Sequence, residues 1–275
     1  MNRPADEHNS TDDALTRHRD ELKKRFPLPS PPQKTRHHNS TSGVLAVLMV
    51  LAGGLFWLDP AYRRDVYSST AGQVQRLELD DGSRVTLDGA SQIEVSWHLR
   101  SRRVALQTGQ ALFDVAPALY RPFRTLAGST EITVLGTRYN VSRLADSVRI
   151  SVVEGRVGVR GQTTEQLLSP GHQLLSRSGQ LGEPTQVDAQ ALSDWTEGRL
   201  VFERTPLIEV LDTLERQQNT AVHLATPDLA QLPVSGTFDR ANLGTLLTLL
   251  PQILPVELHT ATDGTLSLSR RNLKK

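Results

Sequence analysis

The chain has 275 residues, no cysteine and an almost balanced charge, with 31 basic and 30 acidic residues. The lack of cysteine excludes disulfide bonds, thiolate zinc sites and cysteine nucleophiles. A nucleic-acid-binding protein would carry a strongly basic surface, so the near-neutral charge argues against a nucleic-acid partner. About 215 residues follow the one strongly apolar segment, which is enough for one or two domains.

Residues 1–42 form a polar tail. Thr11 could cap a short helix with Leu15, Leu22 and Phe26 on one side, and the prolines of residues 27–32 would end it. Two interpretations stay open. The tail is either a disordered segment or a short helix that binds a partner through Leu15, Leu22 and Phe26.

Residues 43–58 contain no charged side chain, and we predict that they form a transmembrane helix. The segment is short, because a span usually needs about 17–25 apolar residues, but Ser40, Thr41 and Ser42 can extend it. The long polar tail before it argues against a cleaved signal peptide, and the absence of a polar stripe argues against a core helix. Basic residues cluster before the segment, which predicts a cytoplasmic N-terminus.

Residues 66–181 alternate between apolar and polar side chains, as half-buried strands do. The alternation is clear in Val85 and Leu87, in residues 93–97 and in residues 148–152. Asp81-Gly82 predicts a hairpin turn, and Glu154-Gly155 a second turn. Many short strands at close spacing predict an all-β antiparallel sandwich or roll.

Residues 195–270 change to a helical period. Leu207, Val210, Leu211 and Leu214 predict one apolar helix face, and Leu243, Leu246, Leu247 and Leu250 predict another. We expect Thr205 to cap the first helix and Pro206 to occupy its first turn. Short apolar runs flank both helices, so the sequence predicts a small α+β domain with duplicated β-α-β units and a closing strand near Leu266.

Catalytic motifs are scarce, and we expect neither an enzyme of the envelope nor a metal or cofactor site. Asp80 and Asp81 fall at the predicted turn, and Asp88 follows the next strand. The histidines show no metal-binding spacing. Arg100, Arg102 and Arg103 fit a solvated loop or strand edge, with a partner site as the alternative.

Gly136-Thr137 has reactive potential. A threonine hydroxyl can attack the carbonyl before it, which moves the acyl group from nitrogen to oxygen, and the resulting ester then hydrolyses. Such a shift needs a strained peptide, which glycine permits. The dipeptide alone is not specific, because Gly-Thr also occurs at residues 236, 244 and 264. A turn between strands is the alternative interpretation.

Residues 67–270 carry segments that resemble the FecR family, in that family's order. They include LELDDGSRVTLDGAS, RRVALQTGQALFDVA, ITVLGTRYNV, ISVVEGRVGV and TPLIEVLDTLERQ. The resemblance implies a single-pass inner-membrane regulator of an extracytoplasmic-function sigma factor, with its bulk in the periplasm. It also implies self-cleavage at Gly136-Thr137, because some members of the family cut themselves at this dipeptide.

The resemblance further implies a partner for the C-terminal domain, which is similar to the secretin/TonB short N-terminal fold. That partner is the signalling domain of a TonB-dependent outer-membrane receptor, usually one that imports an iron carrier. The residues assigned to this contact are Trp195, Phe202, Leu207, Val210 and Leu211. An exposed strand edge is a natural place for such docking.

The tail departs from the family pattern. Family members usually carry a larger, tryptophan-rich cytoplasmic domain that holds the sigma factor, whereas residues 1–42 contain no tryptophan. The tail then either contacts the sigma factor through one helix, activates it after proteolysis, or has lost that role. A periplasmic envelope-binding module without sigma-factor control is therefore the alternative function.

Overall fold

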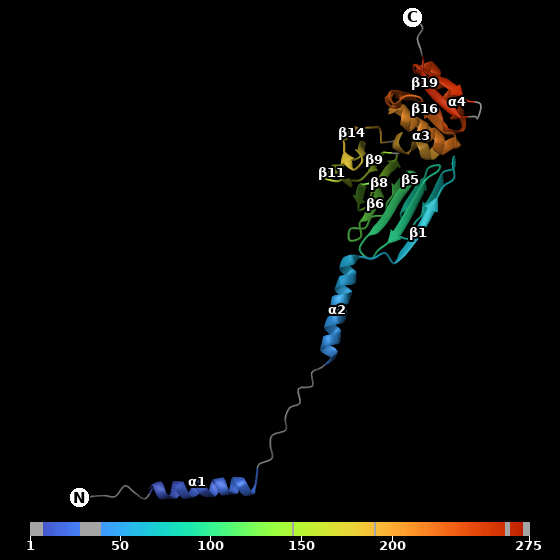
Figure 1. The fold of residues 1–275 in the computed structure, drawn as a ribbon. Coiled ribbons are helices and arrows are strands. Elements are labelled where there is room, and N and C mark those ends of the chain that lie inside the picture. Colours follow the sequence, from blue (N-terminus) through green and yellow to red (C-terminus); the bar gives the residue numbers. More distant parts are fainter. Residues whose placement is uncertain (1–7, 28–39, 145, 190, 262–264, 272–275) are drawn as a thin grey trace. The chain divides into compact units, whose positions relative to one another are not determined.

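The computed structural model describes residues 8–27, 40–144, 146–189, 191–261 and 265–271 (Figure 1). The chain divides into two compact units, Met1–Ala52 and Gly53–Lys275. The second unit contains both of the domains that the sequence predicts. They are called here the β domain, residues 63–186, and the C-terminal domain, residues 191–270.

Two helices precede the β domain. Helix α1 (His8–Arg25) covers the predicted helical part of the tail, and helix α2 (Ser40–Leu58) covers the uncharged segment. The apolar side chains of α2 from Val44 to Leu58 are exposed within this chain. Among the residues described, no helix combines the length and the apolar character needed to cross a membrane.

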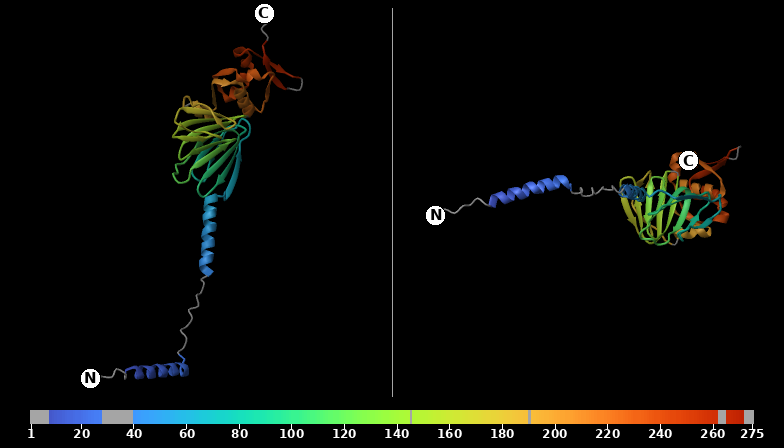
Figure 2. Two further views of the ribbon diagram at one scale, coloured as in Figure 1. Left: turned by 60° about the vertical axis from the view of Figure 1, so that its left-hand side comes forward. Right: turned by 90° about the horizontal axis from the view of Figure 1, so that it is seen from below.

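The β domain is one curled, mainly antiparallel sheet of fourteen strands, which confirms the predicted all-β sandwich or roll (Figure 2). Its strands are β1 (Arg63–Ser68), β2 (Gln75–Glu78), β3 (Arg84–Leu87), β4 (Gln92–Trp97), β5 (Arg102–Asp114), β6 (Phe123–Ala127), β7 (Thr130–Val134), β8 (Arg138–Arg143), β9 (Ser147–Glu154), β10 (Val157–Arg160), β11 (Glu165–Leu168), β12 (His172–Arg177), β13 (Gln180–Leu181) and β14 (Thr185–Gln186).

Strand β5 joins the two halves of this sheet. Its first part pairs with β4 and β6, and its second part pairs with β3 and β8. Gly109 lies where the partners change, with φ of 81°. A Cβ there would lie 2.2 Å from the Ser91 hydroxyl oxygen, so both the backbone conformation and the space require glycine.

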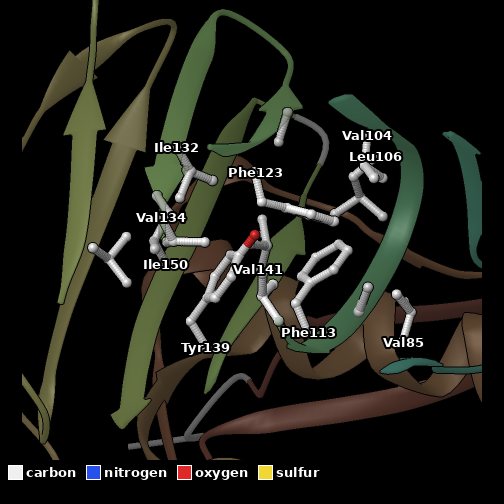
Figure 3. Packing of buried hydrophobic residues seen from close by; sticks show 14 of the residues in the cluster. Val85, Val104, Leu106, Phe113, Phe123, Ile132, Val134, Tyr139, Val141 and Ile150 are labelled. Atoms are coloured by element: carbon white, nitrogen blue, oxygen red, sulfur yellow. The ribbon is translucent and has the colours of Figure 1, made fainter. Parts of the chain in front are cut away.

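The core of the β domain lies between the two halves of the curled sheet. Phe113 stacks on Tyr139, with ring centroids 5.1 Å apart, and contacts Phe123 at 5.9 Å (Figure 3). The buried Tyr139 hydroxyl forms a hydrogen bond of 2.7 Å with Thr125, which satisfies the polar atom inside an apolar cluster. The alternating pattern of the sequence is thus realised as one buried face on strands such as β3 and β4.

The two predicted turns have different outcomes. Asp81-Gly82 joins the paired strands β2 and β3, and Gly82 has φ of 80°, so the hairpin is confirmed. Glu154-Gly155 joins strands that do not pair with each other. Strand β9 pairs with β8 and β12, whereas β10 pairs with β7 and β11. Here the chain crosses from one half of the sheet to the other.

The C-terminal domain follows the predicted order of strands and helices. It contains the 3-10 helix η1 (Ala191–Glu197), then β15 (Arg199–Pro206), α3 (Leu207–Gln218), β16 (Val222–Leu224), η2 (Pro227–Gln231), β17 (Pro233–Asp239), η3 (Arg240–Asn242), α4 (Gly244–Ile253), β18 (Val256–Thr260) and β19 (Leu266–Arg270). Strands β15 and β17 pair with each other, and β16, β19 and β18 form a second small sheet. The β-α-β order occurs twice, as expected.

The predicted cap of α3 is wrong. Thr205 and Pro206 still pair with β17, at Val234 and Pro233, so they end strand β15 instead of starting the helix. The helix begins at Leu207 without a side-chain cap and ends at Gln218, followed by the C-cap Asn219 in the left-handed conformation. Strand pairing to β17 fixes the backbone of Thr205 in the extended form, and this pairing is not visible in the local sequence.

Candidate functional site

The peptide between Gly136 and Thr137 lies in the connection between β7 and β8. The amide of Ala118 donates to the Leu135 carbonyl at 2.7 Å, and the amide of Val115 donates to the Thr137 carbonyl at 3.1 Å. Both contacts come from the segment that follows β5. The peptide is therefore held on each side by the same neighbouring segment.

Two close approaches explain the glycines around this peptide. A Cβ on Gly136 would lie 2.8 Å from Pro117 Cα, so the neighbouring backbone leaves no room for a side chain. Gly155 has φ of 86°, and a Cβ on it would lie 2.9 Å from Thr137 Oγ1 and 3.1 Å from the Gly136 carbonyl oxygen. Gly136 itself is not among the glycines with positive φ. Close packing, and not a left-handed backbone, requires glycine at position 136.

The Thr137 hydroxyl is buried and donates to the carbonyl oxygen of Arg156 at 3.0 Å. A carbonyl oxygen orients the hydroxyl but is a weak base. No ionisable side chain within the described ranges forms a hydrogen bond with this hydroxyl. Among the described residues, the Thr137 hydroxyl thus has no side-chain base beside it, unlike the nucleophile of a hydrolase that acts on separate substrates.

A second polar centre joins the β domain to the C-terminal domain at Asp88. This carboxylate is only 1% exposed. It accepts a hydrogen bond of 2.7 Å from the Gln217 side-chain amide at the end of α3, and one of 3.0 Å from Arg240 of η3. Arg240 also donates to the Trp195 carbonyl at 2.8 Å. One buried acid thus contacts two elements of the other domain.

The backbone around Asp88 comes equally close to α3. The Gly72 amide donates to the Arg216 carbonyl at 3.1 Å. A Cβ on Gly89 would lie 2.7 Å from that same carbonyl oxygen, so glycine is needed for this approach. Arg216 is paired with Asp212, and burial raises the pKa of Asp212 against the opposing effect of Arg216. The junction is built from both side chains and backbone.

Further contacts continue this junction across the sheet. Arg149 of β9 pairs with the nearly buried Glu209 of α3, with 2.6 Å between nitrogen and oxygen. Leu112 of β5 lies in the hydrophobic cluster of the C-terminal domain. A cavity of about 510 Å³ lies beside these contacts and is lined by residues of both domains, including Asn140 and Ser151 of the sheet and Thr205 of β15. The interface combines an apolar contact with paired charges.

The residues assigned to receptor docking lie inside the C-terminal domain. Trp195, Phe202, Leu207, Val210 and Leu211 are all buried and belong to its core cluster. Their apolar pattern reflects burial of α3 and β15 against the rest of the domain, so in this structure they do not form a surface that a partner could contact. Ile208 of α3 and Ile253 of α4 are exposed instead, at 45% and 53%.

The tail residues have a different environment. Leu22 lies on α1, Phe26 follows its end, and both side chains are exposed, at 59% and 72%. Leu15 also belongs to α1, but its side chain lies outside the described residues. Exposure of Leu22 and Phe26 leaves them accessible to a partner.

The prediction that Arg100, Arg102 and Arg103 are solvated is wrong for Arg102. Arg102 is 2% exposed and donates to Asp81 at 2.6 Å, to the Ala116 carbonyl at 3.0 Å and to the Arg121 carbonyl at 3.0 Å. It is a buried structural residue and not part of a solvated loop. The sequence did not reveal this, because Asp81 lies on the β2–β3 turn. Arg100 and Arg103 are exposed, as predicted.

Asp88 is the residue that sequence reasoning missed as a contact between domains. Its partners Gln217 and Arg240 lie 129 and 152 positions away, and no local pattern connects them. Within the described ranges, no three histidine, aspartate or glutamate residues form a group that could hold a metal ion.

Comparison with known proteins gives two family matches. The model described as FecR protein matches residues 65–158, and the model described as FecR, C-terminal matches residues 199–265. No curated protein matches the chain significantly.

Two solved structures, both of a candidate anti-sigma factor from Parabacteroides distasonis, share the fold. Their identities are 24% and 23% and their TM-scores 0.68 and 0.69, and each match covers 76% of this chain and 100% of that chain. The order of the two matched domains agrees with the β domain and the C-terminal domain of the structure. This chain therefore belongs to the FecR family of regulators.

Proposed function

We propose that this protein is a membrane-anchored regulator that relays a signal from a TonB-dependent outer-membrane receptor to an extracytoplasmic-function sigma factor. The observation that carries the proposal is the pairing of a FecR domain with a FecR C-terminal domain in one chain. The name of the similar Parabacteroides distasonis structures supports the link to a sigma factor. Control of genes for iron-carrier uptake is the expected output.

Membrane anchorage at α2 is part of the proposal. Its support is the uncharged sequence of residues 43–58 and the exposure of the apolar side chains from Val44 to Leu58. Exposed apolar surface of this extent is costly in water and stable in lipid. The basic residues before the helix favour a cytoplasmic tail and periplasmic domains.

Receptor docking is assigned to the C-terminal domain. Strands β16 and β18 form the edges of its three-stranded sheet, and each has one unpaired side within the described part of the chain. Such edges offer free amide and carbonyl groups to an incoming strand. The junction at Asp88 would then carry the effect of docking into the β domain, because it connects α3 and η3 to the loop after β3.

A transcriptional reporter tests the whole proposal. Cells that express the full chain should show sigma-dependent transcription that changes when the receptor is stimulated, and deletion of residues 1–42 should abolish the response. Leu22→Ala with Phe26→Ala should weaken it, because these exposed side chains are the proposed sigma contact. A reporter that ignores the deletion would instead favour an envelope-binding module without sigma-factor control.

Self-cleavage at Gly136-Thr137 is the second part of the proposed function. The Thr137 hydroxyl would attack the Gly136 carbonyl carbon and pass its proton to the Thr137 nitrogen, so that the C–N bond breaks, the ester forms and the Thr137 amine is freed. Water would then hydrolyse the ester to a Gly136 carboxylate and restore the Thr137 hydroxyl. Purified full-length protein should give two bands on a denaturing gel, and Thr137→Ala should give one. Thr137→Ser should still cleave, because serine keeps the hydroxyl.

Two further variants sharpen the cleavage test. Gly155→Ala should reduce cleavage strongly, because its Cβ would lie 2.9 Å from the attacking oxygen. Thr237→Ala, in the Gly236-Thr237 dipeptide of β17, is the matched control and should leave cleavage unchanged. A single wild-type band after gentle lysis, or two bands from Thr137→Ala, would reject self-cleavage.

A further inference from the structure

The loops that surround the end of α2 carry an unusual combination of exposed apolar and cationic side chains. Tyr62 is 61% exposed, Leu99 67%, Leu119 74% and Tyr120 96%. Large exposed apolar side chains that gather in one place mark an interaction surface more often than scattered ones do. We refer to this group as the collar, which consists of Tyr62, Leu99, Arg100, Leu119, Tyr120 and Arg121.

Specific contacts bring the collar together around the last turn of α2. The Arg100 guanidinium lies 4.9 Å from the Phe56 ring centroid and donates to the Phe56 carbonyl at 3.4 Å. Arg121 donates to the Tyr62 hydroxyl at 3.1 Å and to the His98 carbonyl at 2.6 Å. The loop from β4 to β5, the loop from β5 to β6 and the segment after α2 therefore meet at one end of the β domain.

Asp59 fixes this arrangement. Its carboxylate accepts hydrogen bonds from the Arg100 amide at 2.9 Å and from the Ser101 hydroxyl at 2.8 Å. Burial raises the pKa of Asp59, but these hydrogen bonds together with the nearby charges of His98 and Arg103 lower it more, so the pKa lies below its ordinary value. The acid at this end of the domain is thus buried and already paired, whereas the collar points outward.

The charge of the collar is positive. Within the described part of the chain, neither Arg100 nor Arg121 forms an ion pair with a carboxylate. Arginine donors are suited to phosphate groups, and tyrosine prefers the boundary between water and hydrocarbon. Together, exposed leucine, tyrosine and arginine without a described carboxylate partner match the headgroup region of a phospholipid bilayer.

The length of α2 points to the same occupant. The 19 residues of α2, Ser40–Leu58, are uncharged. They rise about 28 Å as a helix, slightly less than the hydrocarbon core of about 30 Å. A short span draws its flanking residues toward the lipid or thins the bilayer locally. The residues that flank α2 on the β-domain side include Tyr62, and the loops beside it carry the rest of the collar.

We propose that the collar is a lipid-contacting surface that seats the β domain on the outer face of the membrane in which α2 is anchored. Leu99, Leu119 and the two tyrosines would enter the interfacial region, and Arg100 and Arg121 would bind headgroup phosphates. The inference rests on the proposed anchorage of α2 and adds a second membrane contact. A free β domain on a flexible stalk is the competing arrangement.

Site-specific labelling tests the collar, and the absence of cysteine makes single labels possible without background. The full chain is reconstituted in vesicles of zwitterionic and anionic phospholipid, with a fluorophore on Tyr120→Cys or Leu99→Cys. Lipids that carry a quencher near the headgroup should reduce the fluorescence of both labels. Ser129→Cys is the matched control, because it is exposed in the turn at the other end of β6 and should not be quenched.

A label on Leu51→Cys separates the collar from the anchor. If the Leu51 label is quenched by lipid while the Tyr120 and Leu99 labels behave like the Ser129 label, the collar inference fails and anchorage stands. If none of the four labels is quenched, both fail. Quenching of the collar labels without the Leu51 label would support the collar and reject anchorage.

The charge contribution has its own variant. Arg100→Gln should lower the ratio of lipid-bound to free collar label about fivefold in anionic vesicles, in line with the attraction of one arginine to an anionic surface. Arg84→Gln is the control, because Arg84 is exposed and pairs with Asp114 elsewhere in the sheet. Equal quenching in the wild-type and Arg100→Gln proteins would remove phosphate binding from the proposal.

Discussion

Asp88→Ala is expected to destabilise the junction between the β domain and the C-terminal domain by about 3–5 kcal/mol, the usual cost of removing one partner of a buried ion pair. The change removes the side-chain acceptor of the Gln217 amide and the carboxylate that pairs with Arg240, which then keeps only the Trp195 carbonyl among its described acceptors. Chemical denaturation followed by tryptophan fluorescence measures the effect, because Trp195 lies in the cluster beside this junction.

Asp80→Ala is the matched control for this prediction. Asp80 lies on the β2–β3 turn, is exposed, and pairs only with Arg63 among the contacts described. An exposed pair of this kind is worth about 0–1 kcal/mol. If Asp88→Ala and Asp80→Ala shifted the denaturation midpoint equally, the junction would not depend on the buried acid. Asp88→Asn should fall between alanine and wild type, because it keeps an acceptor oxygen.

Arg102→Met should destabilise the β domain by a comparable amount, about 3–5 kcal/mol. The variant removes the guanidinium from Asp81, from two backbone carbonyls and from the face of Phe123, where the arginine lies 5.4 Å from the ring centroid. Methionine fills similar space but donates no hydrogen bond. Thermal unfolding by circular dichroism measures the loss.

Arg103→Met is the control for Arg102→Met, since Arg103 is 45% exposed and lies 3.8 Å from Asp59. A melting temperature lowered equally by both variants would contradict a special role for Arg102.

The pH dependence of stability gives an independent check. Burial raises the pKa of Asp81, but hydrogen bonds from Ser83 and Arg102 have a larger, opposite effect. The pKa therefore lies below its ordinary value of 3.8.

The sign of that pH effect follows from linkage. Because the folded pKa of Asp81 lies below the unfolded one, the ion pair contributes its full stability above pH about 4 and loses it as the pH falls through the folded pKa. In Arg102→Met the Asp81 carboxylate has lost its cationic partner, so protonation at low pH removes an unpaired negative charge. The difference in free energy of unfolding between wild type and variant should therefore shrink in acid.

The sequence predicted the elements of this fold better than their connections. Alternation identified the buried faces of β3, β4 and β9, and the spacing of Leu207, Val210, Leu211 and Leu214 located α3. These signals are local, because they depend only on which side of one element is buried. Glu154-Gly155 resembles a hairpin turn locally, and only the pairing of β10 with β7 shows that it is a crossover.

The candidate sites also combine features that are visible in the local sequence with features that depend on tertiary contacts. Gly136-Thr137 could be selected from the sequence, but the roles of Pro117 and Gly155 beside it depend on tertiary contacts. Apolar residues such as Phe202 were assigned to a partner although they belong to the core, because a hydrophobic pattern predicts burial without identifying what covers it. Asp88 and Arg102 could not be predicted as buried, since their partners come from other elements.

The order of the strands predicts that the two products of self-cleavage would stay together. A break after Gly136 would leave β1 to β7 in the first fragment and β8 to β19 in the second, yet β5 would still pair with β8 and β7 with β10. The two pieces would remain interlocked as a nicked, non-covalent heterodimer under native conditions. Separating the two fragments would require breaking these strand pairings. A pulling force on the cleaved chain could therefore release one fragment from the other, which it could not do in an uncleaved chain.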